Sequence, residues 1–465
     1  MGIQNGLVAD IVISDLAKDK VLHLAMNHLV LSNRDLEVTL MTVRRELLRL
    51  ASEDLLSESF VPLITAFGFR AALNEYINPV SEAEQSAINQ IVEHLGDVNK
   101  ENLATYKYDL LLLAMYMPFS ELPSDEELVE IPLKFWPKEL KLLAIQTLFD
   151  IKVESHIAAL IPDFTRKKVC NPNIVSRKVR QQYEESPYPR WKKLGIQPNK
   201  KTYSEHYAYL KSHTLFKQPK SYDLLVAGCG TGEHPLQDAA LIKNLSITAL
   251  DLSAPSLAYG ERKRKEFKIK NVKFFRGDIL DLHESPKRYD IVESVGVLHH
   301  MADPAHGLKN ILNCLKPNGV IQLGLYSVIA RRPFQILREH YKTYIGDDGT
   351  VDKKRVLALR NDLLRNRNPD LYWADHAFDF YCFSGFRDLL FHAQEHQFTI
   401  PMIVDLLSEC NLKFLGFHLP GNVIRHKLSL FPGESSSTDL LTWANYEEMY
   451  PSTFLRMYNF HCCRK

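Results

Sequence analysis

The sequence predicts an α/β protein in which a mostly parallel β-sheet follows an all-helical N-terminal domain. From residue 222 onward, short apolar runs alternate with helix-like segments, as in parallel strands joined by crossover helices. Before about residue 175, Leu, Val and Met instead recur at intervals of three and four, the period of an amphipathic helix. A length of 465 residues exceeds one ordinary core, so several domains are expected.

The composition predicts three regions along the chain. Residues 1–175 form the helical N-terminal domain, and residues 176–221 form a connector rich in Pro, aromatic and basic residues that can serve as a lid. Residues 222–465 form the α/β domain, with a predominantly helical insertion at 328–400. The helical domain carries no recognisable chemistry, so it either packs and oligomerises or binds a protein partner.

Seven segments of the α/β domain have the length and apolar content of strands. They are 221–228, 245–253, 271–279, 289–298, 319–327, 411–419 and 452–462. The intervals between the first five are long enough for crossover helices, which predicts that these strands run parallel.

The overall charge favours no class of charged partner. The chain has 57 Lys and Arg against 56 Asp and Glu, so its formal net charge is +1. The apolar run at 110–117 is too short to span a membrane, and the N-terminus does not resemble a signal peptide. Seven cysteines without regular spacing indicate reduced thiols and a cytoplasmic location.

A turn with three alternating glycines follows the first predicted strand. In the segment VAGCGTG, Gly228, Gly230 and Gly232 can adopt positive φ and let a ligand approach the backbone. Pro235 suits the first turn of a following helix, whose free amides favour an anion. The same pattern also occurs in tight turns that only satisfy packing. Residues at the neighbouring strand ends are therefore needed to distinguish a ligand-binding turn from a packing turn.

Two acidic residues lie at the ends of the next two predicted strands. Asp251 can accept hydrogen bonds from ribose hydroxyls, and Asp278 with Ile279 can meet an adenine amine and ring. Alone, each carboxylate is more often a solvated loop residue or a helix cap. At successive strand ends of one parallel sheet, however, the two converge on the carboxyl edge, where such folds bind ligands.

The spacing of the turn separates two cofactor classes. A dinucleotide fingerprint has its third glycine one place later, where this sequence has Glu233, a poor neighbour for a pyrophosphate. S-adenosylmethionine has no phosphate and ends in an amine and a carboxylate. The turn therefore favours S-adenosylmethionine over a dinucleotide, and disfavours an oxidoreductase.

The segments VAGCGTG, ALDLS, RGDI, SVGVLHHMADP and LKPNGVIQLGLYS resemble, in this order, the motifs of class I S-adenosylmethionine-dependent methyltransferases. The resemblance implies a Rossmann-like, mostly parallel sheet of seven strands. VRQQYEESPYPRW, SGFRDLLFHAQEH and WANYEEMYPSTFLRMYNF further resemble the methyltransferase module of bacterial proteins in which tetratricopeptide repeats precede the catalytic part. Those repeats are missing here, which leaves their partner-binding role without support.

The resemblance implies the cofactor contacts. The glycines would wrap the methionine end, Asp251 and Leu252 would hold the ribose, and Asp278 and Ile279 the adenine. Ser294 and Val295 begin the segment that would border the transferred methyl group. Our candidates for a lid are Tyr183, Tyr188 and Arg190, because aromatic rings can enclose a sulfonium. The alternative is a rigid connector packed on the sheet.

Histidines supply the other candidate groups. His299 or His300 could act as a general base, although a satisfied loop histidine is the more common role. His392 belongs to H-x-x-E-H, an inverted zinc-protease pattern, but no third ligand is identifiable. We therefore predict no metal site. The predicted acceptor pocket is lined by Asp375, His376, Arg387 and His392.

These features predict a methyltransferase that moves a methyl group by direct displacement to an acceptor, with a small molecule or a protein side chain favoured. One alternative is a regulatory or scaffold protein that binds S-adenosylmethionine without turnover. Another is an RNA methyltransferase, because residues 328–368 carry an excess of five basic residues. A solvated basic helix face explains that excess more simply, since aromatic residues for base stacking are few.

Overall fold

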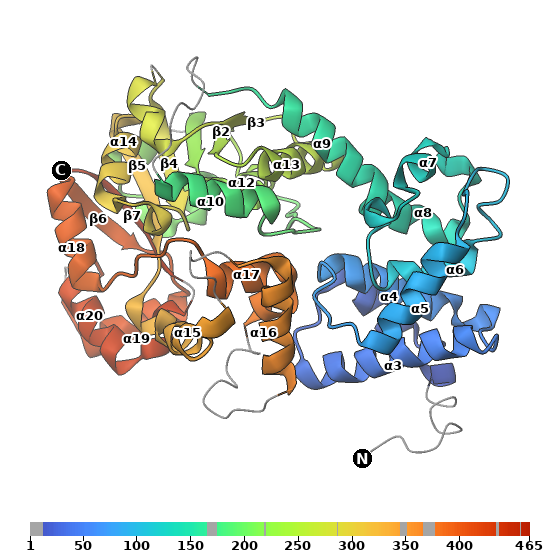
Figure 1. Cartoon of the computed structure of the whole chain (residues 1–465). Helices are drawn as coiled ribbons and strands as arrows, with labels where there is room; N and C mark the ends of the chain where they lie inside the picture. The colour runs from blue at the N-terminus through green and yellow to red at the C-terminus, as the bar shows by residue number, and fades with distance from the viewer. Residues whose placement is uncertain are drawn as a thin grey trace. The chain divides into compact units, whose positions relative to one another are not determined.

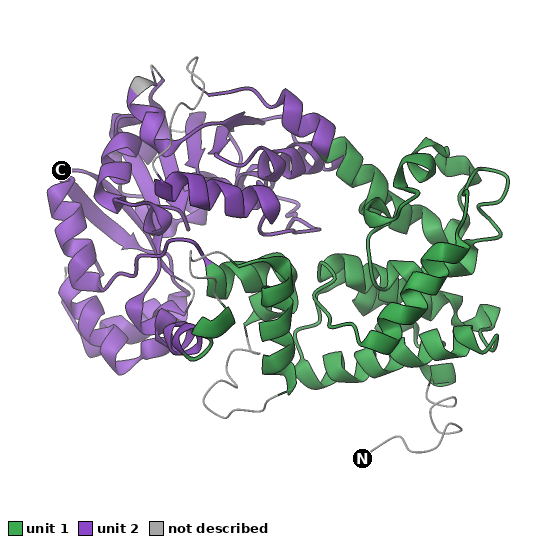
Figure 2. Ribbon diagram, viewed as in Figure 1, with its two compact units in different colours: residues 1–154, 340–391 green, residues 155–339, 392–465 purple. Residues whose placement is uncertain are grey.

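The computed structural model describes residues 13–164, 174–217, 220–285, 287–344, 351–365, 377–433, 437–455 and 457–465. Contacts divide the chain into two compact units (Figure 2). The first comprises residues 1–154 and 340–391, and the second comprises residues 155–339 and 392–465.

The first unit is built from helices alone among its described residues (Figure 1). Its helices are α2 (Lys20–His28), α3 (Arg34–Ser52), α4 (Val61–Leu73), α5 (Glu82–His94), α6 (Lys107–Ala114), α7 (Asp125–Glu130), α8 (Lys138–Ala144), α16 (Lys353–Arg365) and α17 (Phe383–Phe391). Ten of the 13 residues of α4 are buried, which makes it the central helix of this core. The helical prediction for the N-terminal region is confirmed.

Local sequence fixes where several of these helices begin. The Asn33 side chain accepts a hydrogen bond from the Leu36 N–H at 2.9 Å and caps α3. Ser81 and Glu84 form a reciprocal capping box at the start of α5. Such caps satisfy amides that the helix leaves without partners, and each contributes about 1 kcal/mol.

Part of the predicted insertion belongs to this helical unit. Arg360 in α16 forms an ion pair with Glu37 in α3, with 2.7 Å between Nη2 and Oε2, and both side chains are buried. Ahead of α17, the Phe383 N–H donates to the Asn74 carbonyl at 3.2 Å. The helices α16 and α17 therefore belong to a unit whose other helices are far from them in sequence, whereas the predicted boundaries after residues 175 and 221 stay a prediction.

The second unit contains the predicted sheet, and its seven strands confirm the predicted fold class. The strands are β1 (Tyr222–Ala227), β2 (Leu245–Asp251), β3 (Val272–Arg276), β4 (Tyr289–Val295), β5 (Leu315–Leu325), β6 (Leu412–Phe417) and β7 (Tyr458–Arg464). Their order is β3-β2-β1-β4-β5-β7-β6. The first five are parallel, and β7 runs antiparallel to both β5 and β6.

Helices cover both faces of this sheet. Leu224 and Val226 of β1 pack in the apolar core with α12 and α13, whereas Leu225 and Ala227 pack in the core with α14, α18 and α20. The strand is apolar on both faces because both are buried. The helices are α9 (Asp150–Leu160), α10 (Ile174–Glu185), α11 (Tyr203–His206), α12 (Glu233–Leu241), α13 (Ala254–Glu266), α14 (Pro304–Leu312), α15 (Val328–His340), α18 (Ile400–Glu409), α19 (Gly421–Leu430) and α20 (Leu440–Met449).

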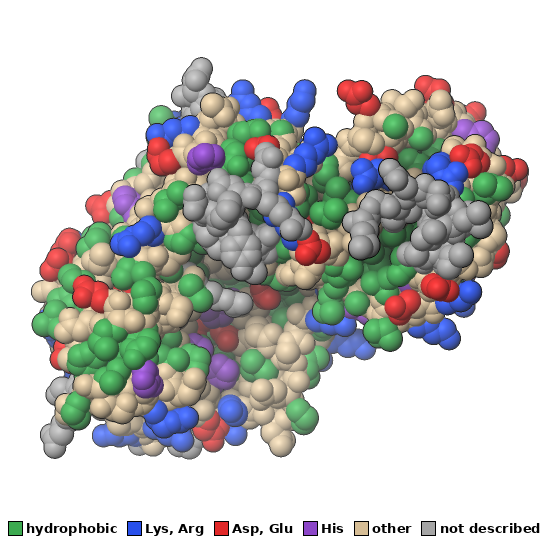
Figure 3. All heavy atoms as spheres, turned by 90° about the horizontal axis from the view of Figure 1, so that it is seen from below, with side chains coloured by type: hydrophobic (Ala, Val, Ile, Leu, Met, Phe, Trp, Pro, Cys, Tyr) green, Lys and Arg blue, Asp and Glu red, His purple; other side chains and the backbone are tan. Residues whose placement is uncertain are grey.

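The surface reflects the balanced charge of the sequence. On the face drawn in Figure 3, basic and acidic side chains are interspersed and do not gather by sign. None of the helices that the structure describes is long and apolar enough to cross a lipid bilayer.

Candidate functional site

The glycine turn connects β1 to α12 at the carboxyl edge of the sheet. Gly228, Gly230 and Gly232 have φ angles of 83°, 52° and 78°, in the left-handed region that side chains disfavour. A Cβ added at Gly228 would lie 2.4 Å from the Val297 Cγ2 atom, so only glycine fits there. The positive φ angles predicted for the three glycines are confirmed.

The amides of this turn are used inside the chain. The N–H groups of Gly228 and Cys229 both donate to the Leu250 carbonyl, at 2.8 and 2.9 Å, and the Gly232 N–H donates to the Cys229 carbonyl at 2.9 Å. The Gly230 N–H donates to the Asp251 carboxylate at 2.7 Å. A loop that cradles phosphates instead directs several free amides at its ligand. These four amides are therefore not available to a pyrophosphate.

Asp251 lies at the end of β2 and contacts the turn directly. Its Oδ2 accepts from the Gly230 N–H, and its Oδ1 accepts from the Ser253 N–H at 2.9 Å, across the neighbouring Leu252. Burial raises the pKa of the Asp251 carboxyl, while hydrogen bonds from the backbone of Ser253, Gly230 and Leu252 oppose that rise. A carboxylate has about four acceptor positions, so at least one remains for a hydroxyl group of a ligand.

Asp278 and Ile279 follow β3 at the same edge. The Asp278 side chain accepts from the Leu280 N–H at 2.9 Å and caps a short 3-10 helix, Ile279–Glu284. Both residues are buried, and burial raises the pKa of the Asp278 carboxyl. The helix-cap alternative thus applies to Asp278, and its unused lone pairs are what an adenine amine could meet.

The aromatic connector lies against the turn. The Tyr183 carbonyl accepts from the Ser253 hydroxyl at 2.9 Å, and the Tyr188 carbonyl lies 3.1 Å from where a Cβ of Gly230 would be. The indole N–H of Trp191 donates to the Thr231 carbonyl at 3.2 Å. The third lid candidate, Arg190, lies with its guanidinium carbon 5.7 Å from the centre of the Tyr259 ring in α13. The connector is consequently fixed to the strand ends beside the turn.

The end of β4 places Ser294 and Val295 at this edge. Ser294 is fully buried, and its hydroxyl has no hydrogen-bond partner among the described residues. A buried hydroxyl without a partner costs free energy unless a ligand or water completes it. Val295 is paired with Gly324 of β5.

Four of the predicted residues form one cluster of rings beyond β4. The rings of His300 and His392 are stacked with centroids 3.4 Å apart, and the Tyr183 hydroxyl lies 3.1 Å from Nε2 of His392. His299 stacks on Tyr326 at 3.9 Å. The candidate base, substrate and lid residues are therefore neighbours, although they come from three separate segments of the chain.

Burial controls the charge of this cluster. It lowers the pKa of His299 well below its usual value, with further contributions from His300, His392 and Arg331. It also lowers the pKa of His392 to about 3. Neither ring nitrogen of His299 has a hydrogen-bond partner among the described residues. Such rings are neutral near pH 7 and are weak bases. They are therefore better suited to forming hydrogen bonds with the methyl acceptor than to removing a proton from it.

Neither suspected metal pattern assembles. Glu395 of the H-x-x-E-H segment pairs with Arg331, with 3.0 Å between Oε1 and Nε, while His392 meets Tyr183. A second group of possible ligands, His299, His300, Asp303 and His306, does not assemble either, because Asp303 accepts from the His306 N–H at 3.0 Å and caps α14.

Two predicted substrate residues, Asp375 and His376, lie outside the described residues. Arg387 belongs to α17 of the helical unit. Of the four proposed acceptor-pocket residues, the structure therefore places His392 alone in the ring cluster.

The sequence did not point to Tyr326, Arg331 or Glu395 as members of this cluster. Arg331 is buried, and its guanidinium carbon lies 4.4 Å from the centre of the Tyr326 ring. The sequence did contain one usable signal, because Tyr326 lies at the carboxyl end of the fifth predicted strand, 319–327.

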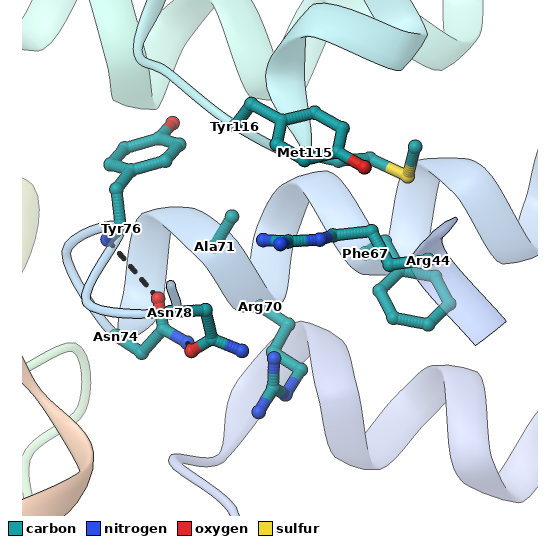
Figure 4. A pocket seen from close by; sticks show the side chains of 9 residues that line it. All are labelled: Arg44, Phe67, Arg70, Ala71, Asn74, Tyr76, Asn78, Met115 and Tyr116. Carbon is teal, nitrogen blue, oxygen red and sulfur yellow. Dashed lines mark hydrogen bonds between the residues drawn. The ribbon is translucent and has the colours of Figure 1, made fainter. Parts of the chain in front are cut away.

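A small cavity in the helical unit is a separate feature (Figure 4). It is lined by Arg44, Phe67, Arg70, Ala71, Asn74, Tyr76, Asn78, Met115 and Tyr116. Arg44 there pairs with Glu84 at 2.9 Å. The cavity has room for about one water molecule. It is too small for a substrate.

Comparisons with known proteins match part of the chain. Residues 225–321 match the family model described as "Methyltransferase domain". An uncharacterized protein of Synechococcus sp. is 27% identical over 257 residues, which cover 53% of this chain and 61% of that protein. The ubiquinone biosynthesis O-methyltransferase of Pseudomonas savastanoi pv. phaseolicola is 26% identical over 139 residues, 29% of this chain and 57% of that enzyme. The matches thus span about three fifths of these relatives.

Among solved structures, PKMT2 from Rickettsia typhi in complex with AdoHcy aligns over 58% of this chain and 54% of its own. The TM-score is 0.40 and the sequence identity is 18%. The family match at residues 225–321 and the observed seven-stranded sheet together identify this part of the chain as a methyltransferase domain with the class I, Rossmann-like fold.

Proposed function

We propose that the chain is an S-adenosylmethionine-dependent methyltransferase, and the glycine turn with Asp251 is the observation that carries this proposal. The backbone N–H groups of the turn donate hydrogen bonds within the protein, and one of them binds the Asp251 carboxylate at Gly230. That arrangement repels a pyrophosphate but leaves carboxylate lone pairs free for ribose hydroxyls. It therefore suits an adenosine cofactor without phosphates.

When bound, S-adenosylmethionine supplies an electrophilic methyl group on a sulfonium. The glycine turn would accommodate its methionine end, Asp251 its ribose, and Asp278 with Ile279 its adenine. Ser294, whose hydroxyl has no partner in the part of the chain that the structure describes, would donate at the inner wall of the site. Catalysis would come mainly from positioning the acceptor in line with the methyl group and from excluding water.

The ring cluster is our candidate for the acceptor side of the site. His299, His300 and His392 are neutral or buried rings that can accept or donate hydrogen bonds without adding charge. Relatives named for an O-methyl transfer and, in Papaver somniferum, for the N-methyl transfer of (S)-coclaurine N-methyltransferase align to this chain. These names include both oxygen and nitrogen as the methyl acceptor atom, so they do not narrow the acceptor. We keep a small molecule or a protein side chain as the proposed acceptor.

Calorimetry with the whole chain tests the cofactor. We expect binding of S-adenosylmethionine and S-adenosylhomocysteine and no binding of NAD. Absence of binding for both methionine-derived ligands would overturn the proposal, and binding of NAD alone would favour a dinucleotide enzyme.

Transfer of a radiolabelled methyl group into fractionated cell extract tests turnover and identifies the acceptor. We expect label in a small-molecule or protein fraction. Label that is sensitive to ribonuclease would favour an RNA methyltransferase. Cofactor binding without label in any fraction would instead favour a regulatory or scaffold protein.

A further inference from the structure

Three ligand-type side chains meet beneath the glycine turn. His234 and Asp238 lie one turn apart in α12, and Glu293 faces them from β4. The His234 Nε2 atom lies 2.9 Å from Glu293 Oε2 and 3.3 Å from Asp238 Oδ2. All three ligand atoms lie within 4.8 Å of one another.

Among the described residues, no group donates a hydrogen bond of good geometry to the two oxygens that face the histidine. Asp238 is 6% exposed and Glu293 is fully buried, yet Oδ2 of Asp238 and Oε2 of Glu293 have only the close contact with His234. The His234 Nε2 atom is close to both oxygens but is aligned for a hydrogen bond with neither. Buried carboxylate oxygens are normally satisfied, so this arrangement needs an explanation.

A chain of hydrogen bonds ends at the Glu293 carboxylate. The Tyr203 hydroxyl lies 2.7 Å from Glu293 Oε1 and 2.8 Å from Nε2 of His461, whose Nδ1 lies 2.7 Å from the Tyr209 hydroxyl. If Tyr209 donates to His461 and His461 donates to Tyr203, then the Tyr203 hydroxyl proton is directed at Glu293. This outer contact orients the carboxylate, as partners of metal ligands commonly do.

The three groups can reach neutrality in two ways. Two ionised carboxylates and one imidazolium would leave one negative charge in a desolvated position, and burial beside Glu293 raises the pKa of Asp238, which lets that carboxyl take up a proton instead. The N-terminus of α12 favours negative charge, but this effect is small beside the cost of a buried carboxylate without a counter-ion. Alternatively, a dication bound by two carboxylates and a neutral imidazole gives a neutral site.

We propose that His234, Asp238 and Glu293 bind a divalent first-row transition metal ion of the Zn²⁺ or Mn²⁺ type. Imidazole nitrogen with carboxylate oxygens is a ligand set that suits these ions, whereas Mg²⁺ and Ca²⁺ prefer oxygen alone. With metal–ligand bonds of about 2.1 Å, neighbouring ligands lie about 3.0 Å apart in an octahedral site and about 3.4 Å apart in a tetrahedral one. The observed separations of 2.9 and 3.3 Å match these spacings.

The site is open to an ion and close to the turn. The His234 side chain is 29% exposed, which provides a route from solvent to otherwise buried ligands. His234 is also the second residue of α12, directly after the turn that ends at Gly232. A bound ion would join the start of this helix to β4. This inference concerns metal binding and holds whether or not the chain transfers methyl groups.

The test is a titration of the chelator-treated whole chain with Zn²⁺ and, separately, Mn²⁺, followed by calorimetry and by metal analysis after dialysis. We expect one equivalent of bound ion per chain. In His234→Gln and Asp238→Asn, we expect the affinity to fall by about tenfold to 100-fold or more, since each removes one ligand. X-ray absorption of the Zn²⁺ form should show nitrogen and oxygen ligands without sulfur.

The matched control is His306→Gln, which removes an exposed histidine elsewhere in the same unit and should leave the stoichiometry and affinity unchanged. Circular dichroism checks that each variant is folded. If His234→Gln does not fold, Asp238→Asn, which keeps the side-chain shape, still tests the site. Absence of a bound equivalent in the wild type, or equal affinity in both ligand variants and the control, would overturn the proposal.

Discussion

At the residue scale, Asp251 combines two tasks. It holds the backbone of the turn through the N–H groups of Gly230 and Ser253, and in the proposed function it also holds the ribose. We expect Asp251→Ala to weaken binding of S-adenosylhomocysteine by about 1–3 kcal/mol, because charge-assisted hydrogen bonds are lost. Calorimetry measures this change.

The matched control is Asp223→Ala, at the opposite end of β1, where the carboxylate is 36% exposed. We expect its affinity to equal that of the wild type. If Asp251→Ala also keeps the wild-type affinity, the ribose assignment is wrong.

The first glycine of the turn is the position least tolerant of a side chain. Gly228→Ala would strain a backbone with φ of 83° and place a Cβ 2.4 Å from Val297. We expect a loss of about 2–4 kcal/mol in the free energy of unfolding, from left-handed backbone and overpacking together. Chemical denaturation measures it.

Gly195→Ala is the comparison, because the nearest group to its added Cβ is the end of the flexible Gln237 side chain at 3.3 Å, and no positive φ is involved. Its stability should stay within about 0.5 kcal/mol of the wild type. Equal losses in the two variants would contradict the steric account of Gly228.

At the element scale, the strands were predictable and the helix contacts of the insertion were not. Each strand is an apolar run long enough to cross the sheet, and strands buried on both faces show this directly in sequence. The pairing of α16 with α3 depends on Arg360 meeting Glu37, and no local pattern relates residues so far apart.

This pair gives a prediction for the helical unit. Both side chains are buried, so Arg360→Met leaves the Glu37 carboxylate without its closest cation. We expect the free energy of unfolding to fall by about 3–5 kcal/mol. Thermal or chemical denaturation followed by circular dichroism checks this value.

Two further variants define the outcome. Lys353→Ala in the same helix removes an exposed contact with Glu121 at 3.7 Å and should change stability by less than about 0.5 kcal/mol. Combining Arg360→Met with Glu37→Gln should recover part of the loss, because the unpaired charge is gone. A loss below 1 kcal/mol for Arg360→Met alone would argue against a buried pair.

At the scale of the whole molecule, buried histidines predict acid sensitivity. The pKa of His392 is about 3 and that of His299 is lowered strongly, whereas an unfolded histidine titrates near 6.5. The unfolded chain therefore binds protons below pH 6.5 that the native rings exclude. Their contribution to stability is complete above pH 6.5 and is lost as the pH falls from 6.5 toward 3.

We expect the free energy of unfolding to fall by up to about 1.4 kcal/mol per pH unit for each ring in this range. Groups facing the rings are Tyr183, Tyr326, Arg331, Arg338 and Glu395. Denaturation between pH 5 and 7 should give a shallower slope in His392→Asn than in the wild type, and an unchanged slope in His306→Gln. Identical slopes in all three would contradict the burial of His392 as a neutral ring.

The sequence by itself determined the sheet, the glycine turn and the two acids after β2 and β3. These features are local, because apolar runs, positive-φ glycines and strand ends are each set within a few residues. Parallel strands then bring the acids to one edge whatever surrounds them. The helix-cap role of Asp278 is equally local, because it depends on the Leu280 amide two residues on, and it was one of the two alternatives for this carboxylate.

Only the tertiary structure decided which groups meet across long separations. It joined Tyr183, His300 and His392 into one cluster, and it placed Glu293 opposite His234 and Asp238. Glu293 stands inside an apolar strand and His234 inside a helix start, so neither shows its partner in sequence. Their meeting follows from how α12 packs on the sheet, a contact that only the folded chain defines.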